Sequence, residues 1–209
     1  MQTRTAARIA NAPPARLLLD NDRYFDPNPA VRTAARTIYE STRDLPLICP
    51  HGHVDAAILA ENRPFPEPAT LFIKPDHYIF RMLYSRGIRM ESVGVPTRDD
   101  TAVETDARRV WQIFADNYYL FSGTPTGAWL DYELAIVFGA GEKLRPDNAQ
   151  RIYDELSEKL QSPEFLPRAL FDRFNIEVLA TTDRESDLLE HHAAIAHDQQ
   201  RIVEPVQDL

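Results

Sequence analysis

The chain has 209 residues, 44% of them hydrophobic and 26% charged, which is an ordinary composition for one globular domain with a sizeable core. Its net charge of −9 argues against a nucleic-acid-binding protein, which normally carries a basic stripe. No apolar stretch approaches the roughly 20 residues that span a membrane, and the N-terminus lacks the apolar segment of a secretory signal. The single cysteine, Cys49, excludes an internal disulfide framework. We therefore expect a soluble, cytoplasmic protein.

The first part of the chain predicts one helix, one strand and a second short helix. Asn28-Pro29 is typical of a helix start, with Asn28 as N-cap, and residues 31–41 have helical apolar spacing. The apolar run Leu45 to Cys49 predicts a strand, and residues 55–62 predict a short helix. A proline-rich connector follows at 63–68, because proline is incompatible with a helix interior or a central strand.

The middle of the chain is predominantly helical in pattern. We expect helices over the ranges 75–86, 101–120, 130–138, 148–161 and 164–173, with a turn at 123–127. Trp129 and Tyr132 are expected in the core, the usual place of aromatic side chains at such spacings.

The end of the chain predicts a second strand and a last helix. Residues 175–182 are apolar and β-branched, which favours a strand, and an amphipathic helix is expected over 184–197. One strand, a long helical segment and another strand indicate an α/β organisation.

His51-Gly52-His53 directly follows the first predicted strand. Side chains at i and i+2 of an extended segment point to the same side, so both imidazoles can converge on one metal ion. A zinc site needs at least three protein ligands, and no second metal-binding motif is present, so another ligand must come from a distant residue or from outside the chain. The alternative is an ordinary surface or core pair of histidines.

His77 and Tyr78 open the helix that follows Pro75-Asp76. Asp76 is a plausible N-cap, and a helix N-terminus attracts anions such as a substrate carboxylate. Tyr78 could then act as a hydrogen-bond or proton partner, and Arg81, one turn later, could face the same pocket. In the alternative, His77 and Tyr78 only pack against a neighbouring strand and Arg81 is solvated.

Asp183 follows the second predicted strand at its carboxyl end, where polar residues of parallel α/β proteins usually line the active face. The alternative role, which is compatible with the first, is the N-cap of a helix beginning at Arg184. His191 and His192 are neighbours and point about 100° apart on a regular helix, so at least one is expected at the surface.

Several blocks of this sequence, in order, resemble the uronate (glucuronate) isomerase family. The blocks are Leu45 to His53, Ala60-Glu61-Asn62, Pro75 to Met82, and Leu179 to Asp183 followed by Leu189-Glu190-His191-His192; Leu17 to Asp22 is also similar. The resemblance implies a distorted (β/α)8 barrel of the amidohydrolase superfamily. Residues 1–209 would form part of that domain, with about 88–173 as a helical insertion between the first two strands.

The resemblance also implies an activity and roles for residues. Such an enzyme, an intramolecular oxidoreductase, interconverts D-glucuronate and D-fructuronate, or D-galacturonate and D-tagaturonate. His51 and His53 would be ligands of a divalent metal, with zinc expected. Tyr78 would be catalytic, and His77, Arg81 and Asp183 would bind substrate. The expected partner is a small-molecule hexuronate, without nucleic acid or membrane, and a homo-oligomer is compatible with the family.

Three departures from the family pattern bear on this assignment. The family often has cysteine between the histidines and an acid before them, where this chain has Gly52 and Pro50. Its members are more than twice as long, and Val203 to Leu209 does not match the segment expected after the second strand and helix. We therefore expect an N-terminal portion of an isomerase with two barrel strands. A metal-dependent hydrolase of the same superfamily and an inactive truncated fragment remain alternatives.

Overall fold

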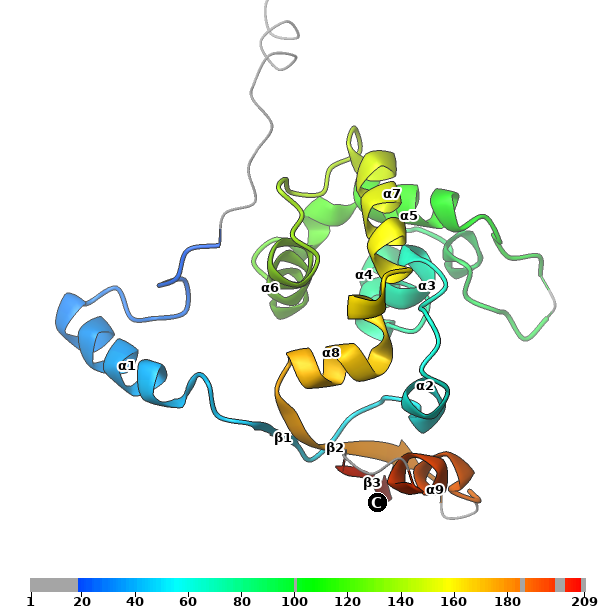
Figure 1. Cartoon of the computed structure of the whole chain (residues 1–209). Coiled ribbons are helices and arrows are strands. Elements are labelled where there is room, and N and C mark those ends of the chain that lie inside the picture. Colours follow the sequence, from blue (N-terminus) through cyan, green and yellow to red (C-terminus); the bar gives the residue numbers. More distant parts are fainter. Residues whose placement is uncertain (1–18, 100, 185–186, 198–201, 208–209) are drawn as a thin grey trace, which may run out of the picture. The chain divides into compact units, whose positions relative to one another are not determined.

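The computed structural model describes residues 19–99, 101–184, 187–197 and 202–207, the last range as backbone only. The chain divides into two compact units (Figure 1). The unit named here the sheet unit comprises Tyr24–Phe65 and Leu160–Leu209. The unit named here the helical unit comprises Pro66–Lys159 together with the segment up to Arg23.

The sheet unit is an α/β structure built on parallel strands. Its elements are α1 (Pro29–Thr42), β1 (Leu47–Cys49), α2 (Ala56–Glu61), η5 (Pro163–Phe165), α8 (Pro167–Arg173), β2 (Ile176–Asp183), α9 (Glu190–His197) and β3 (Ile202–Gln207). The strand order is β1-β2-β3, and both pairs are parallel. Figure 1 shows the three strands side by side with α9 beside them. The α/β class predicted from the sequence is confirmed.

The third strand corrects the sequence-based expectation of two. β3 pairs with β2 over its whole length, from Val178↔Ile202 to Asp183↔Gln207. Pro205 lies within this strand opposite Thr181, although proline cannot donate a ladder hydrogen bond. β3 has β2 as its only neighbour among the described strands, and an edge position is where a strand tolerates proline.

The core of the sheet unit lies between β2 and helices α2, α8 and α9. Its buried residues are Ala56, Leu59, Phe171, Leu179 and Ile195. Along β2, Leu179, Ala180 and Thr181 are all buried, although consecutive strand residues point to opposite faces. Both faces of β2 are therefore covered at this point, as is usual for a parallel strand.

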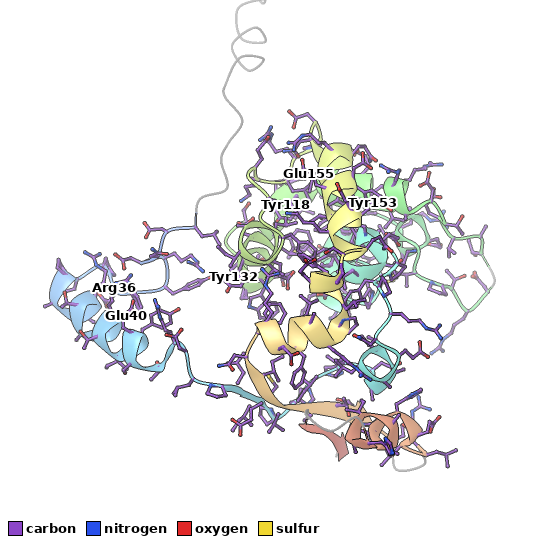
Figure 2. All side chains as sticks on the ribbon, viewed as in Figure 1. Arg36, Glu40, Tyr118, Tyr132, Tyr153 and Glu155 are labelled. Atoms are coloured by element: carbon purple, nitrogen blue, oxygen red, sulfur yellow. The ribbon has the colours of Figure 1, made fainter. Side chains whose placement is uncertain are left out.

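Helix α1 begins where the sequence predicted but buries none of its residues. The Asn28 side chain accepts hydrogen bonds from the backbone of Ala30 and Val31, and Pro29 is the first helical residue. Arg36 and Glu40 form an ion pair of 3.6 Å along the helix (Figure 2). Ile38 remains 66% exposed. In the described structure this helix is therefore stabilised by its N-cap and by ion pairs between successive turns, not by burial.

The helical unit contains short helices joined by turns and irregular segments. Its elements are α3 (Pro68–Phe72), α4 (His77–Ser85), η2 (Met90–Val93), α5 (Ala107–Asp116), η3 (Tyr118–Phe121), α6 (Pro125–Tyr132), the π-helical turn η4 (Glu133–Val137) and α7 (Ala149–Leu160). Acidic or hydroxyl side chains cap α3, α4, α5 and α6: these are Glu67, Asp76, Asp106 and Thr124. Each cap accepts hydrogen bonds from otherwise unpaired first-turn N–H groups.

An aromatic cluster forms the core of the helical unit. Trp111 is fully buried, its indole N–H donates to the carbonyl of Ala149 at 2.9 Å, and its ring contacts those of Phe72 and Phe114. Tyr118 and Tyr153 lie in the same region (Figure 2), and the Trp111 and Tyr153 ring centroids are 6.1 Å apart. The hydrogen bond from Trp111 fixes α5 against the start of α7.

Several boundaries differ from the sequence-based prediction. Residues 101–106 are not helical, because Asp106 caps α5 and helix begins only at Ala107. Gly127, expected in a turn, lies inside α6, where a side-chain Cβ would come 2.0 Å from the carbonyl oxygen of Phe121. The expectation that Trp129 and Tyr132 are core residues is wrong, since they are 57% and 45% exposed.

Helix α9 also begins later than expected, at Glu190 rather than near Arg184. Leu189 has a φ of +53°, a left-handed conformation that a regular helix does not accommodate. In the part of the chain that the structure describes, no helix is long and apolar enough to cross a membrane.

We expect Ile152→Ala to lower the free energy of unfolding of the helical unit by about 3 kcal/mol, because it leaves a cavity in a closely packed core. Ile152 is 1% exposed. The matched control is Ile136→Ala, where the side chain is 52% exposed and a change below about 0.5 kcal/mol is expected. Both tryptophans of the chain, Trp111 and Trp129, lie in this unit, so urea unfolding followed by tryptophan fluorescence reports on it. Equal losses in the two variants would contradict the assigned core.

Candidate functional site

The two histidines of the His51-Gly52-His53 segment converge at the end of β1. Pairing of β1 with β2 ends at Cys49↔Leu179, and the next residue, Pro50, has no N–H to continue the ladder. Beyond it, the Nε2 atoms of His51 and His53 lie 3.0 Å apart, with ring centroids 4.8 Å apart and planes at 82°. Both side chains are exposed. The two imidazoles therefore meet on one side, as the i, i+2 spacing predicts.

The donor atoms of this pair fit a divalent metal ion. Two imidazole nitrogens bound to one zinc ion at the usual 2.0–2.1 Å and tetrahedral angles lie roughly 3.3 Å apart, close to the separation found here. Without an ion, one ring donates an N–H to the other. Among the residues that the structure describes, no group of three or more His, Cys, Asp or Glu side chains is placed to hold a metal. A metal ion held by His51 and His53 would therefore need further ligands from elsewhere.

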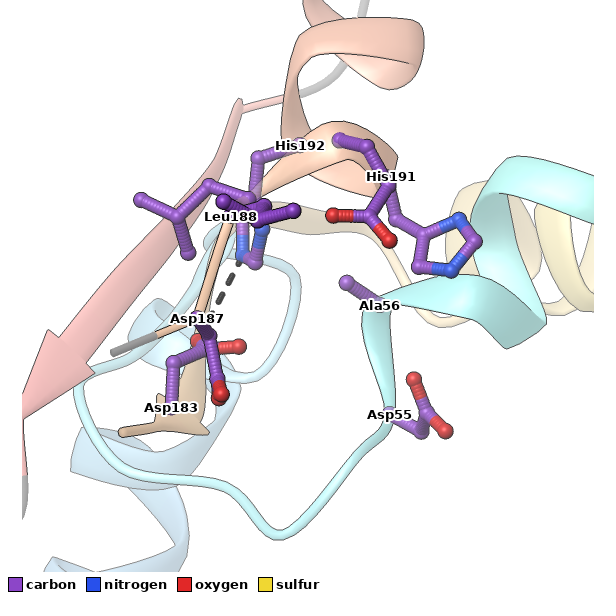
Figure 3. Close-up of a pocket in the computed structure, with 9 residues that line it drawn as sticks. Asp55, Ala56, Asp183, Asp187, Leu188, His191 and His192 are labelled. Carbon is purple, nitrogen blue, oxygen red and sulfur yellow. Dashed lines mark ion pairs between the residues drawn. The ribbon is translucent and has the colours of Figure 1, made fainter. Parts of the chain in front are cut away.

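The carboxyl end of β2 carries a hydrogen-bonded chain of three side chains. The Thr181 hydroxyl donates to Asp183 Oδ2 at 2.6 Å and lies 2.8 Å from Nε2 of His192, a residue of α9. Because the hydroxyl proton is given to Asp183, His192 is the donor in the second bond. His192 Nε2 also lies 3.6 Å from Asp183 Oδ2 (Figure 3). These hydrogen bonds fix the Asp183 carboxylate and anchor α9 to β2.

A pocket of about 350 Å³ opens beside these hydrogen-bonded side chains (Figure 3). Its polar lining comes from Asp55, Asp183, Asp187, Glu190, His191 and His192. Asp55 has a second role, because its carboxylate accepts the N–H of Ala57 at 2.9 Å and caps α2. The structure therefore gives Asp183 a place in a pocket wall at a strand end. A helix beginning at Arg184, which Asp183 could have capped, is not found in the described part of the chain, since α9 begins at Glu190.

His77, Tyr78 and Arg81 share helix α4 in the helical unit, whereas His51, His53 and Asp183 belong to the sheet unit. Asp76 caps α4 as predicted, accepting from the N–H of Tyr78 at 2.7 Å. The rings of His77 and Tyr78 have centroids 4.2 Å apart, and Tyr78 is 56% exposed. Their side chains, and that of Arg81, are accessible rather than packed in a core, which leaves them free to contact a ligand.

Glu133 is a further titratable residue of the helical unit. It begins the π-helical turn η4, and burial, followed by the nearby charge of Asp76, raises its pKa to about 7. Such turns occur frequently at functional sites. Asp76 thus connects Glu133 electrostatically to the start of α4, where His77 and Tyr78 lie.

Comparison with known proteins identifies the family. The family model described as glucuronate isomerase matches residues 28–206. The chain belongs to the glucuronate isomerase family. Uronate isomerase from Nostoc punctiforme is 55% identical over 179 residues, covering 85% of this chain and 38% of the relative. That from Mesorhizobium japonicum is 52% identical over 178 residues, with the same coverage of both chains.

Solved structures of the glucuronate isomerase family have the same fold over this region. The crystal structure of glucuronate isomerase from Caulobacter crescentus matches with a TM-score of 0.88 and 42% identity, over 92% of this chain and 40% of that one. Uronate isomerase from Thermotoga maritima matches with a TM-score of 0.77 and 25% identity, over 91% of this chain and 39% of that one. The chain thus spans about two fifths of the length of its relatives. The family match reaches residue 206, so it extends through most of β3 and into the tail that was expected to depart from the family pattern.

Two residues of the site region were not assigned a role from the sequence. His192 is one of two adjacent histidines, and only the packing of α9 on β2 shows which one is turned inward. Glu133 stands in the apolar run Glu133 to Phe138, so its unusual surroundings were visible in the sequence, but its proximity to Asp76 was not.

We expect the stability of the helical unit to fall as pH rises from 4.5 to about 7 because of Glu133. Folding favours the neutral carboxyl, so its contribution is present below the ordinary pKa of 4.5 and is lost as pH passes the folded-state value of about 7. Glu133→Gln stays uncharged, so at pH 8 this variant should be more stable than the wild type by about 2 kcal/mol and at pH 4.5 about equal to it.

Urea unfolding followed by tryptophan fluorescence at pH 4.5, 6 and 8 measures this difference. The matched control is Glu158→Gln, an exposed glutamate of the same unit, which should leave the pH profile as in the wild type. Parallel profiles for Glu133→Gln and the wild type would show that Glu133 is not the group responsible.

Proposed function

We propose that this chain forms the N-terminal part of a uronate isomerase, which interconverts an aldose hexuronate such as D-glucuronate and its ketose. The observation that carries the proposal is the family match over residues 28–206, supported by 55% identity to a uronate isomerase. The substrate class is a small hexuronate, and the proposed location is the cytoplasm. D-Galacturonate and D-tagaturonate are the second proposed pair, and a homo-oligomer is the proposed assembly.

The proposed architecture is the first three strands of a distorted (β/α)8 barrel. Three parallel strands in the sequential order β1-β2-β3 support it, since neighbouring strands of such a barrel are parallel and follow one another in sequence. A helical segment lies between β1 and β2, and among the described elements α9 is the one that lies between β2 and β3. Closure takes eight strands, and β1 and β3 are the two edges of the described sheet.

His51 and His53 are the proposed ligands of a divalent metal, with zinc the proposed ion. Their converging Nε2 atoms and their position at the carboxyl end of a parallel strand support this role. A divalent metal held by His51 and His53 would polarise the sugar oxygens and stabilise negative charge on them.

The reaction is a proton transfer between adjacent carbons of the open-chain sugar acid. Removal of the proton beside the carbonyl gives an enediolate, and protonation at the neighbouring carbon completes the shift. We assign to Tyr78 the transfer of a proton at the substrate hydroxyl, since its phenol is exposed at the start of α4. We assign substrate binding to His77, Arg81 and Asp183. Arg81 supplies the positive charge for the uronate carboxylate, and Asp183 accepts a hydrogen bond from a sugar hydroxyl.

A chimeric enzyme tests this proposal. Residues 28–206 of this chain replace the matching segment of the Caulobacter crescentus enzyme, and ketose formation from D-glucuronate is followed. We expect measurable turnover that is lost with His51→Ala. Tyr78→Phe should lower kcat at least about 100-fold, the usual contribution of a general acid or base.

The matched control for Tyr78 is Tyr84→Phe, another exposed tyrosine on the same helix, 61% accessible. It should keep the activity of the parent chimera. A folded chimera without turnover of D-glucuronate or D-galacturonate would contradict the proposed function, and equal losses in the two tyrosine variants would contradict the role of Tyr78 alone.

A further inference from the structure

The last residues of β2 point alternately to two different neighbours. Thr181 and Asp183 face α9, where they join His192. Thr182, between them, faces the segment that follows β1, and its hydroxyl donates to the carbonyl oxygen of Gly52 at 3.0 Å. The alternation follows from the two-residue period of a strand.

The hydrogen bond from Thr182 lies where backbone pairing between the two strands has stopped. The β1–β2 ladder ends at Cys49, and Pro50 has no N–H to extend it. The next segment nevertheless stays close to β2, because a Cβ on Gly52 would lie only 2.9 Å from the carbonyl oxygen of Ala180. The absence of a side chain at Gly52 permits this approach, and the Thr182 hydroxyl binds the carbonyl oxygen of Gly52 itself.

We propose that Thr182 is a positioning residue for the His51 and His53 pair, through its hydrogen bond to the peptide that joins them. The inference rests on the proposed function, since it concerns the proposed zinc ligands. Both imidazoles are exposed, so core packing does not fix their rings. Their 3.0 Å approach depends on the backbone between them, and that backbone is tied to β2 by the Gly52 carbonyl. Residues that orient metal ligands from behind commonly change metal affinity 10- to 100-fold.

Zinc affinity of the purified 209-residue chain is the measurement, made by titrating Zn²⁺ against a chromophoric chelator. The variant His51→Ala/His53→Ala measures how much zinc binds elsewhere on the chain. Thr182→Val keeps the β-branched shape but removes the hydroxyl, and we expect its zinc Kd to rise about 10-fold. Thr182→Ser retains the hydroxyl and should restore affinity close to that of the wild type. If Thr182 contributed only its packing volume, Thr182→Ser would not restore zinc affinity.

The matched control is Thr37→Val, since the Thr37 hydroxyl donates within α1 to the carbonyl of Thr33 at 3.0 Å. This variant should bind zinc as the wild type does. Titrations are made well below the unfolding temperature of every variant, and Thr182→Ala serves as the second hydroxyl deletion if Thr182→Val does not fold. A metal-free readout accompanies them: backbone amide exchange across residues 51–55 should be faster in Thr182→Val than in Thr182→Ser.

The outcomes separate this inference from the proposed function. Unchanged zinc affinity together with unchanged amide exchange in Thr182→Val overturns the positioning role. If the wild type and the double-histidine variant bind zinc equally, the proposed metal site fails. In that case the exchange measurement still decides whether Thr182 holds the segment: faster exchange supports the tether and unchanged exchange overturns it.

Discussion

Parallel pairing of β1 with β2 is the constraint on which the candidate site in the sheet unit depends. Parallel strands end at the same edge of a sheet, so residues that follow β1 and residues that close β2 are brought together despite their distance along the chain. The His51-Gly52-His53 segment and the Thr181-Thr182-Asp183 segment meet for this reason. Pro50 stops the β1–β2 ladder, and beyond it the hydrogen bond from the Thr182 side chain to Gly52 takes the place of backbone pairing.

The end of β2 connects two parts of the sheet unit because its side chains alternate. On one side, buried Thr181 joins Asp183 to His192 and so ties α9 to the sheet. On the other side, Thr182 reaches Gly52. A hydroxyl suits both positions, since it donates one hydrogen bond and accepts others in a small volume. Two adjacent threonines thus bind polar groups on opposite sides of β2: Thr181 binds the side chains of Asp183 and His192, and Thr182 binds the carbonyl of Gly52.

The features predicted correctly from the sequence are those with local causes. Asn28-Pro29 and Asp76 start helices through their own first-turn hydrogen bonds, and the i, i+2 spacing of His51 and His53 brings their rings together. Two features that are not predicted from the sequence depend on distant contacts. No strand is predicted over β3, where Pro205 interrupts the apolar pattern; pairing with β2 and an edge position accommodate this proline. The inward orientation of His192 depends on Thr181, eleven residues away in sequence and on another element.

The proposed barrel would account for the exposure of β1. Parallel strands are normally covered on both faces, as β2 is. Leu47 and Ile48 are instead 49% and 65% exposed, and β1 has no neighbour other than β2 among the described strands. In a closed barrel the first strand pairs with the last, and helices cover its outer face. The relatives, of which this chain spans about two fifths, have the additional length for those strands and helices. The same closure would bring further strand ends, and thus further ligands, to the edge where His51 and His53 already converge.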